Sequence, residues 1–186
     1  EEVPVEGVNT LQMFITNRCN LRCKGCFYEH KLGGKEMTMH EYGKHVIAHC
    51  NEISKVILMG GEPTLHPKLK DMIAFNHSLG LKTTIYTNGR RMRALEEISL
   101  KEVSIRVGIY GAEKSEKPLN KVQGANLPVT IVYMLRKDNI GELMQAAYDA
   151  EKSFSCRNFY ISSIRDIAET HDFWKDNEST INNEEF

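Results

Sequence analysis

The sequence has no long hydrophobic run and no excess of one charge. Its longest clear apolar stretch covers residues 129–135, whereas a membrane-spanning helix needs about 20 apolar residues. The 24 Lys and Arg residues balance 25 Asp and Glu residues, which gives a net charge of −1. Proteins that bind nucleic acid through its phosphates carry a strongly basic surface. These absences argue against a membrane partner and against nucleic acid as a partner.

Several targeting and nucleotide-binding signals are also missing. The N-terminal Glu-Glu-Val-Pro has neither a basic segment nor an apolar stretch, so we expect no secretory signal in this chain. The absence of an initiating Met is typical of a trimmed piece of a longer protein. No Gly-x-Gly-x-x-Gly opens the first βα turn, and no Gly-x-x-x-x-Gly-Lys-Ser/Thr occurs in the chain. The sequence therefore lacks both common nucleotide fingerprints.

The composition is that of an ordinary globular domain. The chain has 186 residues, of which 41% are hydrophobic and 26% charged, and a domain typically has about 150 residues. We expect one domain over 1–186, with an N-terminal lead at 1–10, a core at 11–165 and a polar C-terminal loop or tail at 166–186.

Short β-branched or apolar runs alternate with helical patterns along the core. We expect strands at 11–16, 55–59, 82–87, 103–109, 129–135 and 158–163, and helices at 38–52, 67–79, 90–100 and 140–153. Strands that alternate with helices pair in parallel through right-handed crossovers. The expected fold is α/β, a partial (β/α)6 TIM-like barrel with a parallel sheet. An open doubly wound sheet is the alternative. Between residues 111 and 127 we expect only a broken helix, because Pro118 interrupts it.

Local signals indicate where the helices begin and end. Thr38 and Glu41 have the spacing of a capping box, and Asn139 with Glu142 is a second expected cap pair. The helix at 67–79 carries the apolar residues Leu69, Met72, Ile73 and Leu79 and ends at Gly80. The helix at 90–100 begins with Arg90, Arg91 and Arg93, whose charges the helix dipole disfavours there.

Unusual residues follow every expected strand. The segments that follow the six strands are a cysteine cluster, 60–63, 87–89, 110–111, 136–139 and 162–163. Loops at the carboxyl ends of parallel strands converge on one face of a sheet. We therefore expect a single site at the mouth of the barrel.

The cysteines are few and clustered. Of five, three stand within eight residues, in Cys19-Asn-Leu-Arg-Cys23-Lys-Gly-Cys26, while Cys50 and Cys156 stand apart. Such clustering favours metal ligation in a reducing, cytoplasmic compartment over a disulfide framework. Zinc completed by His30 is one interpretation. An iron–sulfur cluster with three protein thiolates and one open iron is the other.

Three motifs together resemble the radical S-adenosylmethionine (SAM) superfamily. They are the Cys-x3-Cys-x2-Cys loop followed by Phe27, the Gly-Gly-Glu-Pro after the second strand, and the Thr-Asn-Gly after the third. The resemblance covers residues 11–165. It implies a 4Fe–4S cluster on Cys19, Cys23 and Cys26, with its fourth iron chelated by the amino and carboxylate groups of SAM. One-electron reduction would cleave SAM to methionine and a 5′-deoxyadenosyl radical that abstracts a substrate hydrogen.

The resemblance also implies contacts for SAM. The SAM ammonium would lie against Gly60, Gly61 and Glu62, the ribose or methionine carboxylate against Thr87 and Asn88, and the adenine against Phe27 and Ser162. Each of these residues also has a simpler interpretation. Gly60 and Gly61 can form a turn before a helix whose N-terminus Glu62 favours. Asn88 can belong to an ordinary Asn-Gly turn, and Phe27 can be a core aromatic.

The fourth strand departs from the family pattern. Relatives often end it with Ser-x-Asp-Gly, whereas this chain has Gly108-Ile109-Tyr110-Gly111, which puts the contact to the SAM carboxylate in doubt. Alternation along the strand turns Arg106 and Tyr110 into the barrel, where an unpaired cation is costly. We expect Arg106 to bind an anion, either the SAM carboxylate or the substrate; an ion pair with Glu62 is the alternative.

The expected function is hydrogen abstraction by a radical SAM enzyme. The sequence leaves the substrate open between a peptide or protein, a nucleotide and another small molecule, and an anionic substrate would suit Arg106. Flavodoxin or ferredoxin would donate the electron. A glycyl-radical-enzyme activase is one specific alternative, and a zinc-stabilised α/β binding domain is the non-enzymatic one.

Overall fold

The structure is a computed structural model that describes residues 9–23, 26, 28–95, 98, 103–109, 129–136, 138–153 and 156–163. The expected lead at 1–8, the connection at 111–127, Phe27, Tyr110 and the tail at 166–186 lie outside the described residues. Within the described part, no helix is long and apolar enough to cross a membrane.

Six strands and three α-helices make up the described fold, together with short 3-10 turns. The strands are β1 (Thr10–Thr16), β2 (Lys55–Gly60), β3 (Lys82–Thr87), β4 (Val103–Ile109), β5 (Val129–Leu135) and β6 (Cys156–Ser163). The helices are α1 (Met39–His49), α2 (Leu69–Ser78) and α4 (Leu143–Ser153). The 3-10 turns are η1 (Glu29–Lys31), η2 (Pro63–Leu65), η3 (Met92–Leu95) and η4 (Ile140–Glu142).

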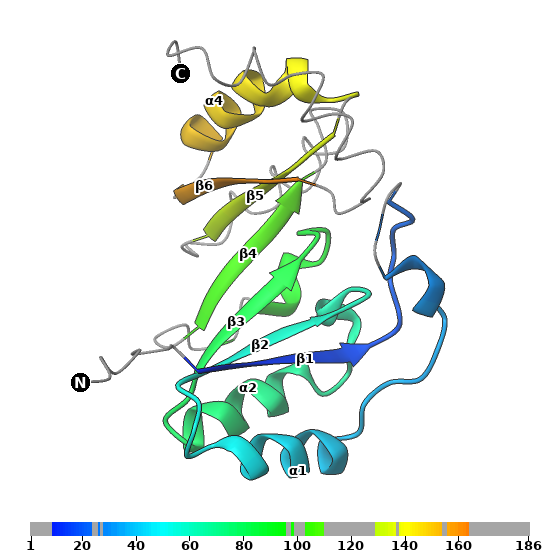
Figure 1. Ribbon diagram of the computed structural model, residues 1–186, viewed down its shortest axis with the longest axis vertical. Helices are drawn as coiled ribbons and strands as arrows, with labels where there is room; N and C mark the ends of the chain where they lie inside the picture. Colours follow the sequence, from blue (N-terminus) through cyan, green and yellow to red (C-terminus); the bar gives the residue numbers. More distant parts are fainter. Residues whose placement is uncertain are drawn as a thin grey trace, which may run out of the picture.

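The strands form one parallel sheet in the order β1-β2-β3-β4-β5-β6. Sequential order is the order of a (β/α) barrel, whereas a doubly wound sheet reverses direction partway. The helices lie along one face of the curved sheet, with α1 and α2 beside β1 to β3 and α4 beside β5 and β6 (Figure 1). The expected partial barrel is therefore confirmed.

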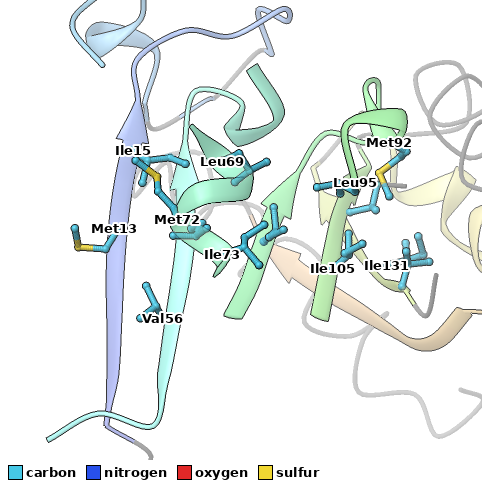
Figure 2. Close-up of a cluster of buried hydrophobic side chains, with 14 of the residues drawn as sticks. Met13, Ile15, Val56, Leu69, Met72, Ile73, Met92, Leu95, Ile105 and Ile131 are labelled. Atoms are coloured by element: carbon cyan, nitrogen blue, oxygen red, sulfur yellow. The ribbon is translucent and has the colours of Figure 1, made fainter. Parts of the chain in front are cut away.

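Alternation along the strands separates a buried face from an open one. On β4, Ile105, Val107 and Ile109 are buried, while the residues between them are partly exposed. The buried residues of β1 to β5 join apolar residues of the helices in a single core (Figure 2), against which Cys156 and Phe159 of β6 pack. Figure 2 shows Met72 and Ile73 of α2 among the buried side chains of the strands. The opposite face of the sheet is the inside of the partial barrel.

Two of the expected helix ends are confirmed. Thr38 and Glu41 form a complete capping box at the start of α1, since each side chain accepts from the backbone N–H of the other residue. Two residues after α2, Gly80 has φ +71°, the left-handed conformation expected there.

Two side chains at helix ends depart from the sequence pattern. Leu79 is 39% exposed and lies outside the core, because it follows the last turn of α2. Asn139 occupies the N-cap position before η4, as expected, but the expected side-chain cap with Glu142 is wrong. Its side chain accepts from the Arg136 N–H and donates to the Met134 carbonyl, so that it closes the turn after β5.

The expected helix at 90–100 is reduced, among its described residues, to the 3-10 turn η3. Met92 and Leu95 are buried in this turn. Arg90 and Arg91 precede η3 and Arg93 lies in it, where their positive charges oppose the dipole of a longer helix.

Candidate functional site

The cysteine loop begins where β1 ends and is bound to the end of β2. The Gly61 N–H donates to the Thr16 carbonyl at 2.8 Å, and the Glu62 N–H donates to the Arg18 carbonyl at 2.7 Å. These bonds continue the β1–β2 pairing past the strand ends, beside the carboxyl edge of the sheet (Figure 1). The first residues of the cysteine loop are therefore hydrogen-bonded to the segment that follows β2.

Two glycines make this close approach possible. A Cβ on Gly61 would lie 2.3 Å from the Arg18 carbonyl oxygen and 3.0 Å from the Cys19 Cβ. Gly60 has φ +153°, and a Cβ there would lie 2.3 Å from the Thr16 carbonyl oxygen. In this structure, the Gly-Gly pair therefore allows the backbone of the cysteine loop to contact β2 directly.

The Glu62 carboxylate is fully buried and joins the ends of β2 and β3. Its Oε1 accepts from the Thr64 N–H at 3.0 Å, the Thr64 hydroxyl at 2.6 Å and the Thr87 hydroxyl at 2.6 Å. Its Oε2 accepts from the Asn88 N–H at 2.7 Å. Glu62 also caps η2, so the simpler interpretation of a capped turn holds locally. The contact across the sheet to Thr87 and Asn88 is additional.

The Asn88 side chain connects this network to the cysteine motif itself. Its Nδ2 donates to the Asn20 Oδ1 at 2.8 Å, and its Oδ1 accepts from the Arg90 N–H at 3.0 Å. Asn20 stands directly after Cys19, and sequence reasoning gave it no role. The one available signal was its position inside the cysteine motif. The hydroxyl of Thr87 is also occupied, since it accepts from the Gly89 N–H.

The three thiols belong to this single loop, and none of the five cysteines forms a disulfide. The Leu21 N–H donates to the Cys19 Sγ at 3.4 Å, and the Cys26 N–H donates to the Cys23 carbonyl at 3.2 Å. Burial raises the pKa of the Cys19 thiol, the Leu21 N–H lowers it, and the charges of Glu62 and Cys26 raise it further. Metal binding would replace the proton that this environment favours.

The donor set, three thiols in one loop, fits a cluster held by three thiolates. In the described ranges, no three His, Cys, Asp or Glu side chains, the three motif cysteines included, are arranged to hold a single metal ion. The zinc site completed by His30 is therefore not formed among the described residues. Three partly buried sulfurs in one anchored loop suit a cubane, in which each sulfur binds a different iron.

An aromatic pair packs together where the chain leaves the cysteine motif. The ring of Tyr28 stacks on Phe14 of β1 with centroids 5.0 Å apart, and its hydroxyl donates to the Asn17 Oδ1. Burial raises the pKa of the Tyr28 hydroxyl.

The remaining predicted residues lie farther along the sheet. Arg106 is in the middle of β4, with Nη1 donating to the Tyr86 hydroxyl. The ion pair with Glu62 is not formed among the described residues, because that carboxylate accepts from Thr64, Thr87 and Asn88. Ser162 is the second-last residue of β6 and pairs with Met134. The structure therefore brings the cysteine loop, residues 60–62 and residues 87–88 together, while Arg106 lies on the neighbouring strand β4, paired with Tyr86, and Ser162 lies on β6.

The fold and the site define a class: a partial barrel with a cysteine loop bound to its carboxyl edge. The sequence model of the Radical SAM superfamily matches residues 13–149. The chain therefore belongs to the radical SAM superfamily, whose members use a 4Fe–4S cluster and SAM.

Individual relatives agree. The GTP 3′,8-cyclase of Aquifex aeolicus (strain VF5) is 30% identical over 146 residues, which are 72% of this chain and 45% of that protein. The sporulation killing factor maturation protein SkfB of Bacillus subtilis (strain 168) is 26% identical over 160 residues, 72% of this chain and 37% of that protein. The chain thus spans less than half the length of these curated relatives.

The fold also matches a solved structure. The crystal structure of Streptococcus suis SuiB bound to S-adenosylmethionine has a TM-score of 0.67 and 13% sequence identity. The match covers 93% of this chain and 48% of that one. At this identity the likeness concerns the fold.

Proposed function

We propose that this chain is the catalytic core of a radical SAM enzyme, with residues 11–165 as its barrel. Cys19, Cys23 and Cys26 hold the 4Fe–4S cluster. SAM lies along residues 60–62 and 87–88, and its adenine lies near Phe27 and Ser162. When bound, the reduced cluster supplies the electron that cleaves SAM to methionine and a 5′-deoxyadenosyl radical, which abstracts a substrate hydrogen.

One observation carries the proposal: three separate motifs form a single hydrogen-bonded unit. The Arg18 carbonyl accepts from the Glu62 N–H, the Glu62 carboxylate accepts from Thr87 and Asn88, and Asn88 donates back to Asn20. The unit thus links both neighbours of Cys19, the first proposed cluster ligand, to the proposed SAM residues. Preorganised geometry of this kind is what the protein contributes when cofactors carry the reaction.

The inner face of the sheet shields the proposed reaction from water. Ile57, Met59, Val132 and Met134 alternate with buried residues and therefore face the inside of the barrel. Their apolar side chains exclude water from the reacting radical.

Flavodoxin or ferredoxin supplies the electron, and the protein acts in the cytoplasm, where closely spaced thiols stay reduced.

Anaerobic reconstitution with iron and sulfide tests the cluster. We expect four irons and four sulfides per chain in the wild type and in Cys50→Ala, a cysteine outside the motif, and loss of the cluster in Cys23→Ala. With SAM and dithionite, the wild type should release 5′-deoxyadenosine. One zinc without sulfide, or a Cys23→Ala protein with a full cluster and full turnover, would overturn the proposal.

Deuterium transfer then identifies the substrate. Each deuterated candidate is incubated with the reconstituted protein and SAM, and the mass of the 5′-deoxyadenosine is measured. Deuterium arriving from a peptide, a nucleotide or another small molecule assigns the class. Deuterium arriving from a glycine of a partner protein assigns a glycyl-radical-enzyme activase.

A further inference from the structure

The inside face of the sheet contains cations and no carboxylate among its strand residues. None of the six strands includes Asp or Glu. By alternation, the charged residues of the described strands on this face are Lys55 and Lys82 at the amino ends and Arg106 in the middle of β4. An anion entering the barrel therefore meets positive charge and no like charge from the strands.

Arg106 is held by two tyrosines and has no anionic partner among the described residues. Its guanidinium carbon lies 5.3 Å from the ring centre of Tyr86 and 5.9 Å from that of Tyr160. Nη1 donates to the Tyr86 hydroxyl. Stacking and cation–π contacts fix the guanidinium plane. The other N–H donors lie in that plane, in the fork that matches a carboxylate or a phosphate.

The tyrosines come from strands on both sides of β4. Tyr86 of β3 pairs directly with Arg106, and Tyr160 reaches it from β6, where its backbone pairs with Val132 of β5. Tyr160 is 50% exposed although it contacts the arginine. The contact therefore stabilises the cation from one side and leaves ring surface for a ligand. A partly buried cation without a counter-charge is costly unless an anion completes it.

We infer that Arg106, with Tyr86 and Tyr160, binds an oxyanion of the substrate, a carboxylate or a phosphate. This rests on the proposed function and extends it to the class of substrate. Arg106 stands three residues before the end of β4, roughly 10 Å below the carboxyl edge. The cysteine loop follows β1, three strands away, or about 14 Å along the sheet. The SAM carboxylate is expected on the cluster or against Thr87 and Asn88, whose hydroxyl and N–H donate to Glu62, so we assign the anion at Arg106 to the substrate and measure SAM affinity separately.

The test compares anion and SAM affinities in the reconstituted protein at constant ionic strength. Pyrophosphate and malonate are titrated by calorimetry in the presence of SAM, and SAM is titrated separately. The variants are Arg106→Met, Arg106→Lys and Lys44→Met; the last removes one positive charge from the exposed surface of α1. Pyrophosphate binding alone indicates a phosphate site, and malonate binding alone indicates a carboxylate site.

We expect Arg106→Met to weaken anion binding at least tenfold, since it removes the charged hydrogen bonds that the guanidinium would donate. Arg106→Lys should retain part of the affinity for the anion. Lys44→Met should bind the anion within about twofold of wild type, and the Arg106 variants should bind SAM within the same range. Equal anion binding in Arg106→Met and wild type, or no anion binding in the wild type, would overturn the inference. So would a tenfold loss of SAM affinity in Arg106→Met alone, which would assign the arginine to SAM. Failure of the wild type to bind SAM would instead refute the proposed function.

Discussion

Glu62→Gln changes the contact between β2 and β3 by a single group of almost the same shape. The carboxylate accepts four hydrogen bonds, three at Oε1 from Thr64 and Thr87 and one at Oε2 from the Asn88 N–H. A glutamine keeps the first three if its carbonyl oxygen takes the Oε1 position. Its NH2 group then faces the Asn88 N–H, so that two donors oppose each other.

The magnitude follows from that one lost acceptor. A hydrogen bond to a charged group contributes about 1.5–3 kcal/mol, and an unsatisfied donor adds its desolvation cost. We expect Glu62→Gln to lower the free energy of unfolding by about 2 kcal/mol. In a chain of 186 residues this corresponds to a fall in Tm of roughly 4–8 °C. Glu62→Ala leaves all four donors without this acceptor and should cost more.

Thermal and urea unfolding of the anaerobic protein measure the effect. Glu151→Gln removes the same charge from an exposed position on α4 and is the matched control. If Glu62→Gln and Glu151→Gln unfold within about 0.5 kcal/mol of each other, the Asn88 N–H does not depend on Glu62. The account of the carboxylate as the link between β2 and β3 would then be wrong.

Three further changes test the same region and the fold. Gly61→Ala places a Cβ 2.3 Å from the Arg18 carbonyl oxygen; it should destabilise the protein by about 1–3 kcal/mol and reduce the iron content after reconstitution. Gly141→Ala is the control, since its Cβ meets nothing within 4 Å. Equal iron contents in the two variants would contradict this reasoning. Asn20→Ala should cost about 1 kcal/mol by removing the bond to Asn88, whereas Asn20→Asp keeps the acceptor and should restore most of it; an unrescued loss would show that the bond is not the cause. The Thr38 N–H and hydroxyl lower the pKa of Glu41 below its usual 4.5, so its carboxylate stabilises the folded state above that pH. The stability difference between wild type and Glu41→Gln should be present at neutral pH and disappear as pH falls below 4.5; a difference that persists in acid would count against the capping box.

The strands could be predicted almost residue by residue. The observed bounds of β3, β4 and β5 are those expected, and β1, β2 and β6 differ by at most two residues at one end. Each strand is a short β-branched or apolar run, and on β4 and β5 its alternation survives in the structure as alternating burial. Since one face packs on helices, the hydrophobic pattern alone fixes these strands.

The helix ends were harder to predict, because a polar side chain can hydrogen-bond to several partners and the sequence does not indicate which one it takes. Asn139 has the residue type and spacing of an N-cap, yet it binds Arg136 and Met134 instead. Thr38 has the same type of signal and does form its cap. The difference is tertiary: Asn139 closes a turn from β5 beside the buried Tyr133 hydroxyl, which donates to the Asn139 carbonyl, whereas Thr38 is exposed.

The site shows a similar division. Cysteine spacing indicated the proposed cluster ligands, because three ligands close together in sequence form a local motif. The partners of Glu62 could not be predicted, since the Thr87 hydroxyl lies 25 residues away in sequence and the Asn20–Asn88 bond spans 68. This coupling has a consequence for interpreting variants. A change at Thr87 or Asn88 also moves Glu62 and the cysteine loop, so lost activity alone does not identify a SAM contact. Only a variant that weakens SAM binding while it preserves iron content and Tm does so.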